Sequence, residues 1–210
     1  MARASALGRF RPSREPPPQL QGDSLEGVEL KLDLLDQTAD TAAPQLLGWH
    51  LVSWVGGERT EIALTEVEAY REDDPASHSF GGPRGRNVIM FERPGLLYVY
   101  RSYGIHWCAN VVCGDLGVGS AILLRAGRPI AGTEIMTKRR GRATNLATGP
   151  GNLCQALGIT GDLNGVDLFE PGAPVTLQPG APPTRIRITP RIGISKAVDN
   201  PWRFLAEDEG

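Results

Sequence analysis

The sequence has few of the residues that build disulfide frameworks, metal centres and membrane spans. Its three cysteines, Cys108, Cys113 and Cys154, form no C-x-x-C pair and cannot all pair with one another. This argues against a disulfide scaffold and a structural zinc site. No apolar run approaches the roughly 18 residues of a membrane span. The first residues also lack the uninterrupted apolar core of a secretory signal. We therefore expect a soluble, intracellular protein.

Motifs for nucleotide cofactors and for serine hydrolases are missing as well. The Gly117-Val118-Gly119 segment lacks the third glycine of the dinucleotide fingerprint, and Gly149-Pro150-Gly151 is not followed by the lysine of a P-loop. No G-x-S-x-G elbow is present. The sequence therefore predicts no nucleotide cofactor.

Glycine and proline, by contrast, are abundant, with 26 and 17 residues in a chain of 210. This composition favours turns and short strands over long helices. Residues 1–25 combine four arginines with a run of three prolines and few apolar residues, so we predict a flexible tail there. Residues 26–210 contain no repeat and no linker, and we predict that they form one α+β domain.

Turn residues divide this domain into short elements. A helix is expected over residues 38–47, with Thr41 as its N-cap and Gly48 as its stop. The expected strands and later helices are as follows: strands at 50–55, 61–70, 96–102, 106–112 and 120–126, helices at 132–140 and 152–157, and short strands within 175–196. Residues 71–95 read as a long loop, and such loops are more often functional than idle.

Charge is distributed unevenly along the chain. Residues 23–74 carry thirteen acidic side chains against three basic ones, whereas residues 84–142 carry ten basic side chains against three acidic ones. A basic middle segment on a chain of net charge −2 is consistent with one face that binds a polyanion. A solvated surface on which the signs happen to segregate is the alternative.

One predicted strand carries candidate catalytic groups. Glu66, Glu68 and Tyr70 alternate, so their side chains share one face of the strand, and Val67 and Ala69 take the other. A carboxylate near the end of an apolar strand and beside a long loop suits a general base. An exposed sheet face with ordinary acidic residues would produce the same pattern.

The neighbouring loop and hairpin add weaker signals. His78 lies between two serines, but adjacent residues rarely form a nucleophile and base pair. His78 with Asp73 and Asp74 could bind a metal, although the other histidines have no ligand-like spacing. Tyr103 lies at the reversal of a hairpin, where a core contact is hard to make. An aromatic side chain there can act as a wedge between stacked bases.

Several segments, in order, resemble the alkyladenine (3-methyladenine) DNA glycosylase family over roughly residues 30–205. They are Val67-Glu68-Ala69-Tyr70, Ala76-Ser77-His78-Ser79, Arg86-Asn87, Pro94-Gly95, Leu97–Gly104, Cys108-Ala109-Asn110, Ala121–Ala126, Gly149–Leu157 and Arg191–Ile194. Each segment is short, but their number and order make the resemblance specific.

The resemblance implies a monofunctional glycosylase that removes alkylated or deaminated purines from double-stranded DNA. It implies a single compact domain built around a curved, mainly antiparallel sheet with short flanking helices. The enzyme would act as a monomer, with no metal and no cofactor. It would lie inside the cell with the DNA, in the cytoplasm at the nucleoid if the protein is bacterial.

The resemblance also implies roles for individual residues. Glu68 would be the general base that activates a water, and Arg125 and the backbone carbonyl of Ile192 would help to hold that water. The base-binding and DNA-contacting residues implied in the same way are Tyr70, His78 and Tyr100 around the extruded base, Asn110 against the 2-amino group of guanine, and Tyr103 in the gap left in the duplex. Such extrusion costs a few kcal/mol, and stacking on aromatic side chains returns about 1–3 kcal/mol per base.

Two other functions are compatible with parts of the sequence. A non-catalytic nucleic-acid-binding module would use the basic segment and the aromatic hairpin, but it would gain nothing from Glu68 facing phosphates. A metal-dependent hydrolase would use Asp73, Asp74 and His78, and it would lose its activity in a chelator.

Overall fold

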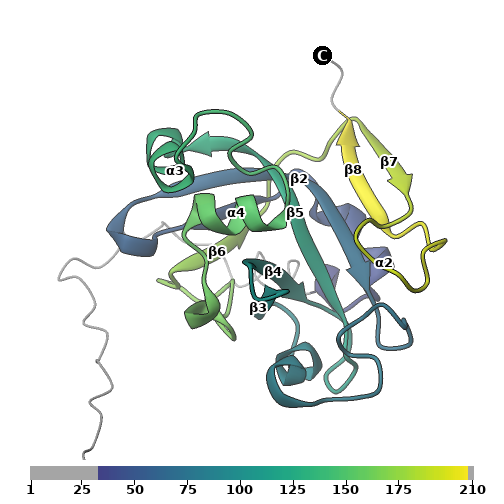
Figure 1. The fold of residues 1–210 in the computed structure, drawn as a ribbon. Helices are drawn as coiled ribbons and strands as arrows, with labels where there is room; N and C mark the ends of the chain where they lie inside the picture. The colour runs from purple at the N-terminus through teal and green to yellow at the C-terminus, as the bar shows by residue number, and fades with distance from the viewer. Residues whose placement is uncertain (1–32, 208–210) are drawn as a thin grey trace, which may run out of the picture.

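The computed structural model describes residues 33–207, which fold around one curled antiparallel sheet (Figure 1). The predicted tail and the domain boundary at residue 26 lie outside the described residues. The strands are β1 (His50–Ser53), β2 (Thr60–Tyr70), β3 (Leu97–Ser102), β4 (His106–Val112), β5 (Ala121–Ala131), β6 (Val175–Gln178), β7 (Arg185–Thr189) and β8 (Arg203–Glu207). The predicted α+β class, with a curved antiparallel sheet and short helices, is confirmed.

The long strand β2 lies at the centre of this sheet. The strand order is β3-β4-β5-β2-β1-β6, and β8 joins β2 to β7. The first half of β2 pairs with β1 and its second half with β8 on the same edge, while β5 pairs along the other edge. Strand β8 was not predicted. Because β8 pairs with Glu66–Glu68 on one edge and β5 pairs with them on the other, both edges of β2 are hydrogen-bonded there.

Short helices cover the sheet, and the longest of those described have eight residues. They are α2 (Ala39–Ala42), η1 (Ala43–Leu46), η2 (Val55–Gly57), η3 (Gly85–Phe91), α3 (Thr133–Arg140), α4 (Pro150–Leu157) and η4 (Gly161–Leu163). None of the helices within residues 33–207 has the length and apolar content needed to cross a bilayer.

Several predicted boundaries were wrong: β1 ends at Ser53 rather than at residue 55, α4 begins at Pro150 rather than at residue 152, and the predicted loop 71–95 contains η3. Two further differences have clear local reasons. The N-cap of α2 is Thr38 rather than Thr41. The Thr38 carbonyl accepts the hydrogen bonds of the first turn, which the amides of Thr41 and Ala42 donate. The helix continues only as the 3-10 turn η1, since Pro44 has no N–H to donate to a preceding carbonyl. Strand β5 runs beyond residue 126 through Pro129, which is tolerated because β4 pairs only with the opening residues of β5.

Two apolar clusters pack around the sheet. The larger one contains Val67 and Ala69 of β2 together with residues from α2, η1 and α4. The smaller one surrounds Tyr98, with Met90 and Phe91 from η3 and with Tyr100 packed against it. Because Val67 and Ala69 enter the large core, Glu66, Glu68 and Tyr70 share the opposite face of β2, as the alternation predicted.

Candidate active site

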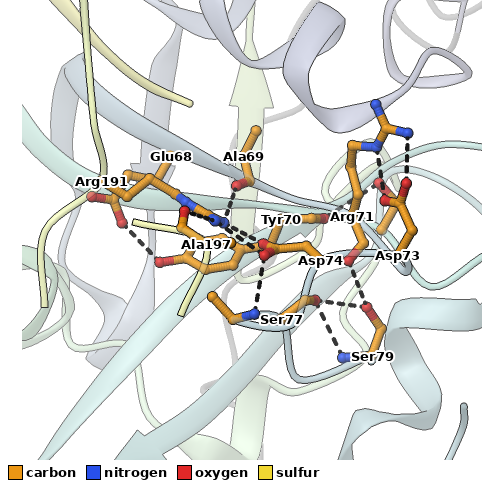
Figure 2. Close-up of polar contacts among 12 residues, drawn as sticks. Glu68, Ala69, Tyr70, Arg71, Asp73, Asp74, Ser77, Ser79, Arg191 and Ala197 are labelled. Carbon is orange, nitrogen blue, oxygen red and sulfur yellow. Dashed lines mark hydrogen bonds and ion pairs between the residues drawn. The ribbon is translucent and has the colours of Figure 1, made fainter. Parts of the chain in front are cut away.

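Glu68 is the buried centre of the candidate site. Its side chain has no exposed surface, so the interpretation of an exposed acidic sheet face was wrong. Three donors hold the carboxylate: Oε2 accepts hydrogen bonds from the Tyr70 hydroxyl at 2.9 Å and from Arg125 Nη1 at 3.1 Å, and Oε1 accepts one from the Ile192 amide at 3.0 Å. Figure 2 shows the contact between Glu68 and Tyr70. A buried carboxylate needs such partners to offset its desolvation.

Arg125 joins this carboxylate to a second one. It reaches across from β5, where its Nε donates to Glu66 Oε1 at 2.8 Å, and Arg203 of β8 donates to the same oxygen at 2.8 Å. Burial raises the pKa of Glu66, but the hydrogen bonds and charges of Arg203 and Arg125 outweigh it, so its pKa lies below the ordinary value. The guanidinium of Arg125 is therefore fixed in direction beside Glu68.

A pocket of about 600 Å³ opens beside this network. Its lining includes Tyr70, His78, Arg86, Met90, Tyr98, Tyr100, Arg101, Tyr103 and Asn110, together with residues 193–196 of the segment between β7 and β8. The pocket therefore brings together five of the residues predicted from the sequence, namely Tyr70, His78, Tyr100, Tyr103 and Asn110.

The aromatic wall of this pocket has a fixed geometry. The His78 ring meets Tyr100 edge-on, with centroids 4.4 Å apart, and Tyr98 stacks on Tyr100 at 5.5 Å. His78 Nδ1 lies 3.1 Å from the Tyr98 hydroxyl. Although His78 opens to the pocket, partial desolvation of its ring and then the charge of Arg86 lower its pKa. The neutral imidazole is therefore favoured near neutral pH.

Asn110 and Tyr70 are also held in place. The buried Asn110 amide donates to the Tyr98 carbonyl at 3.1 Å, which fixes the orientation of its side chain. Burial, followed by the negative charge of Glu68, raises the pKa of Tyr70 above its ordinary value. Tyr70 therefore keeps its hydroxyl proton for the bond to Glu68.

Tyr103 extends from the tip of the β3–β4 hairpin. Tyr103 and Gly104 have φ of 48° and 70°, which is typical of the tight turns that join antiparallel strands. The Tyr103 side chain is 88 % exposed. The prediction that this ring makes no core contact is confirmed.

The candidate metal ligands do not converge. Asp74 pairs with Arg191, Asp73 pairs with Arg71, and His78 faces Tyr98 (Figure 2 shows the first two pairs). Within residues 33–207, no group of three or more His, Cys, Asp or Glu side chains is arranged to hold a metal.

Comparison with known proteins identifies the family. The family model described as Methylpurine-DNA glycosylase (MPG) matches residues 33–210. The chain belongs to this family.

Relatives of this glycosylase family agree with the match. A protein of Nitrosospira multiformis is 47 % identical over 175 residues, covering 82 % of this chain and 87 % of the relative. A protein of Mycolicibacterium fortuitum is 49 % identical over 176 residues, covering 80 % and 88 %. One of Mycobacterium tuberculosis is 49 % identical over 172 residues, covering 78 % and 82 %. Each carries the name "Putative 3-methyladenine DNA glycosylase". The family implies a hydrolase that acts on DNA.

Sequence reasoning missed one charged pair at this site. Arg191 and Asp74 are both buried and form a bidentate ion pair, and the Arg191 guanidinium lies over the Tyr70 ring (Figure 2). Asp74 was considered only as a metal ligand, and Arg191 only as part of a family motif. No local pattern links two residues so far apart in the chain.

Proposed function

We propose that this protein flips alkylated or deaminated purines out of duplex DNA and hydrolyses their N-glycosidic bond with a water activated by Glu68. The observation that carries the proposal is a fully buried carboxylate, held by three donors, beside an aromatic pocket. The family and the names of its relatives support a methylpurine-DNA glycosylase.

The contacts of Glu68 favour one of its oxygens as the base. Among residues 33–207, Oε2 accepts two hydrogen bonds, whereas Oε1 accepts only the one from the Ile192 amide. A carboxylate oxygen has about two lone-pair positions, so Oε1 keeps one for a water. Arg125 and the Ile192 carbonyl would complete the contacts of this water.

The reaction then needs few groups. The water oxygen bonds to C1′ while the C1′–N bond breaks. The electron pair of the C1′–N bond passes to the departing base, and a proton of the water passes to Glu68. A base with an alkyl-induced positive charge leaves as a neutral molecule, whereas an uncharged base such as hypoxanthine leaves as an anion and takes a proton from solvent water. The base would stack between Tyr70 on one side and His78 with Tyr100 on the other, and cation–π attraction would favour a charged base.

This scheme predicts a glycosylase without strand cleavage. No amine nucleophile takes part, so the sugar is not held as an imine and the product is an intact abasic site. Asn110 would exclude normal guanine through its 2-amino group. Tyr103 would fill the gap left in the duplex.

The decisive experiment is Glu68→Gln in single-turnover assays. Duplexes that carry one 3-methyladenine or hypoxanthine are incubated with EDTA present, and alkali then reveals the abasic sites. The amide keeps the shape of the side chain but cannot take a proton, so the rate should fall by more than a hundredfold, about 2.7 kcal/mol of barrier. Binding to an abasic-site analogue should stay within about threefold.

The matched control is Glu61→Gln, a buried carboxylate at the other end of β2 that pairs with His50 and Arg59. It should keep the wild-type rate within about twofold. A Glu68→Gln variant that retains more than a tenth of the rate would show that Glu68 is not the base. Loss of wild-type activity in EDTA would instead favour the metal-dependent hydrolase, and a wild type that binds without releasing a base would favour the binding module.

A further inference from the structure

A buried ion pair lies beside the end of the proposed catalytic strand, next to Ala69 and Tyr70. The side chains of Arg191 and Asp74 both have no exposed surface. Arg191 Nη1 contacts Asp74 Oδ2, and Nη2 donates to Oδ1 at 3.1 Å. Burying two charges costs several kcal/mol per ion. An apolar pair of similar volume would fill this space at lower cost, so the arrangement calls for a reason beyond packing.

The guanidinium of Arg191 connects three parts of the chain. Its Nη1 also donates to the Ala69 carbonyl of β2 at 3.0 Å, and Nη2 lies 3.4 Å from the Ala197 carbonyl of its own loop. Asp74 belongs to the long loop that follows β2. Figure 2 shows these contacts converging on one side chain. A planar group with five donors suits this task, and a lysine ammonium does not.

The same guanidinium also stacks on aromatic rings. It lies 4.6 Å from the centroid of Tyr70 and 5.1 Å from that of Trp202. Tyr70 is therefore held at its ring by Arg191 and at its hydroxyl by Glu68. A desolvated cation–π contact of this kind favours the ring position that faces the guanidinium.

Two short paths lead from Arg191 to the carboxylate of Glu68. The residue next to Arg191 is Ile192, whose amide donates to Oε1 of Glu68. Tyr70, under the guanidinium, donates to Oε2. The following residues 193–196 form one wall of the pocket. Displacement of Arg191 would therefore move a donor on each oxygen of the proposed base.

We propose that Arg191 and Asp74 are positioning residues that set the direction of the Glu68 carboxylate and thereby act on the rate of base release rather than on DNA affinity. This inference rests on the proposed function of Glu68. Because both side chains are fully buried, neither would touch the DNA, and each would act through Tyr70 and Ile192.

The first test is Arg191→Lys. The charge remains, but one ammonium cannot reach Asp74, the Ala69 carbonyl and the Ala197 carbonyl together. The single-turnover rate should fall at least tenfold, whereas the Kd for undamaged duplex should stay within about twofold. Arg59→Lys is the matched control, because Arg59 pairs with a buried carboxylate at the far end of β2. It should change neither quantity by more than twofold.

The second test separates positioning from folding. Replacing the pair by apolar side chains, Arg191→Met with Asp74→Leu, removes both buried charges and should keep the cooperative thermal unfolding of the wild type. If the pair has only a structural role, the stable double variant should release bases at the wild-type rate. The proposal predicts a rate that stays at least tenfold low, because methionine cannot donate to the carbonyls of Ala69 and Ala197. If Arg191→Lys does not fold, the rate of this double variant alone decides between a positioning role and a purely structural role of the pair.

The outcomes distinguish this inference from the function on which it rests. An active Glu68→Gln variant overturns the proposed function. An inactive Glu68→Gln variant together with wild-type rates for Arg191→Lys, or for the folded double variant, overturns only the positioning role. A low rate with intact DNA binding in a folded variant supports it.

Discussion

Tyr103→Asn isolates the contribution of the exposed ring at the tip of the hairpin. The ring is 88 % exposed, so about 25 Å² of a tyrosine side chain is buried, worth about 0.6 kcal/mol at about 25 cal/mol per Å². The backbone of Tyr103 has φ of 48°, which costs a non-glycine residue of order 1 kcal/mol and which asparagine adopts more readily. These terms nearly cancel, so the melting temperature should change by less than about 3 °C.

The effect on base flipping should be much larger. Unstacking a base costs a few kcal/mol, and an aromatic ring that occupies the gap returns about 1–3 kcal/mol. Loss of the ring should therefore lower the flipping equilibrium by about 5- to 150-fold. The fluorescence of 2-aminopurine beside a hypoxanthine lesion, followed by stopped flow, measures this equilibrium. Affinity for undamaged duplex should change far less.

Leu116→Asn provides the control for this substitution. Leu116 is another apolar side chain in a turn, 71 % exposed, and its replacement should leave the 2-aminopurine signal within about twofold. A Tyr103→Asn variant that melts many degrees lower while flipping normally would make Tyr103 a structural residue and refute the wedge.

Two further predictions concern charge near the pocket. Arg86→Gln should raise the pKa of His78, because desolvation and then the Arg86 charge lower it in the wild type; an NMR titration of the imidazole that shows no change would refute this coupling. The pKa of His78 in the folded protein lies below 6.5, its value in the unfolded chain. The free energy of unfolding should therefore fall as the pH drops below 6.5, and it should fall less in Arg86→Gln than in the wild type. The exposed cations Arg86, Arg101 and Lys196 at the pocket predict a slope near −3 for log K against log salt with undamaged duplex, from about −0.9 per phosphate. Arg101→Gln should reduce the slope by about one and Arg59→Gln should not, whereas a flat wild-type plot would exclude a basic surface facing DNA.

Local patterns in the sequence predicted the faces of strand β2 and the reversal of the β3–β4 hairpin. Alternation placed Glu68 and Tyr70 on one face and Val67 and Ala69 in the core, because side chains in a strand alternate whatever the strand pairs with. The Tyr103-Gly104 reversal was also found from local turn chemistry. The charge pattern was less informative, since Arg125 lies in the basic segment but is bound to carboxylates rather than free for phosphate.

What the sequence could not predict depends on contacts between distant residues. Strand β8 lies far from β2 in the chain, and its five residues contain no strong alternation, so only the fold reveals that it pairs with Glu66–Glu68. Asp74 and Arg191 are separated by 117 positions. In a sequence, an aspartate in a polar loop predicts exposure or metal binding, and its burial depends on a partner that local patterns cannot identify.

The pairing of β2 on both edges has a consequence for hydrogen exchange. At Glu66–Glu68 the strand is bonded to β5 on one side and to β8 on the other, so its amides cannot be released by fraying at an edge. Amides in such a position exchange through the most global openings of a protein. The backbone around Glu68 should therefore be among the slowest to take up deuterium, while the Tyr103 turn exchanges early. The contacts that hold the Glu68 carboxylate would then be lost only when the whole domain unfolds, and partially opened molecules would keep the proposed base in place.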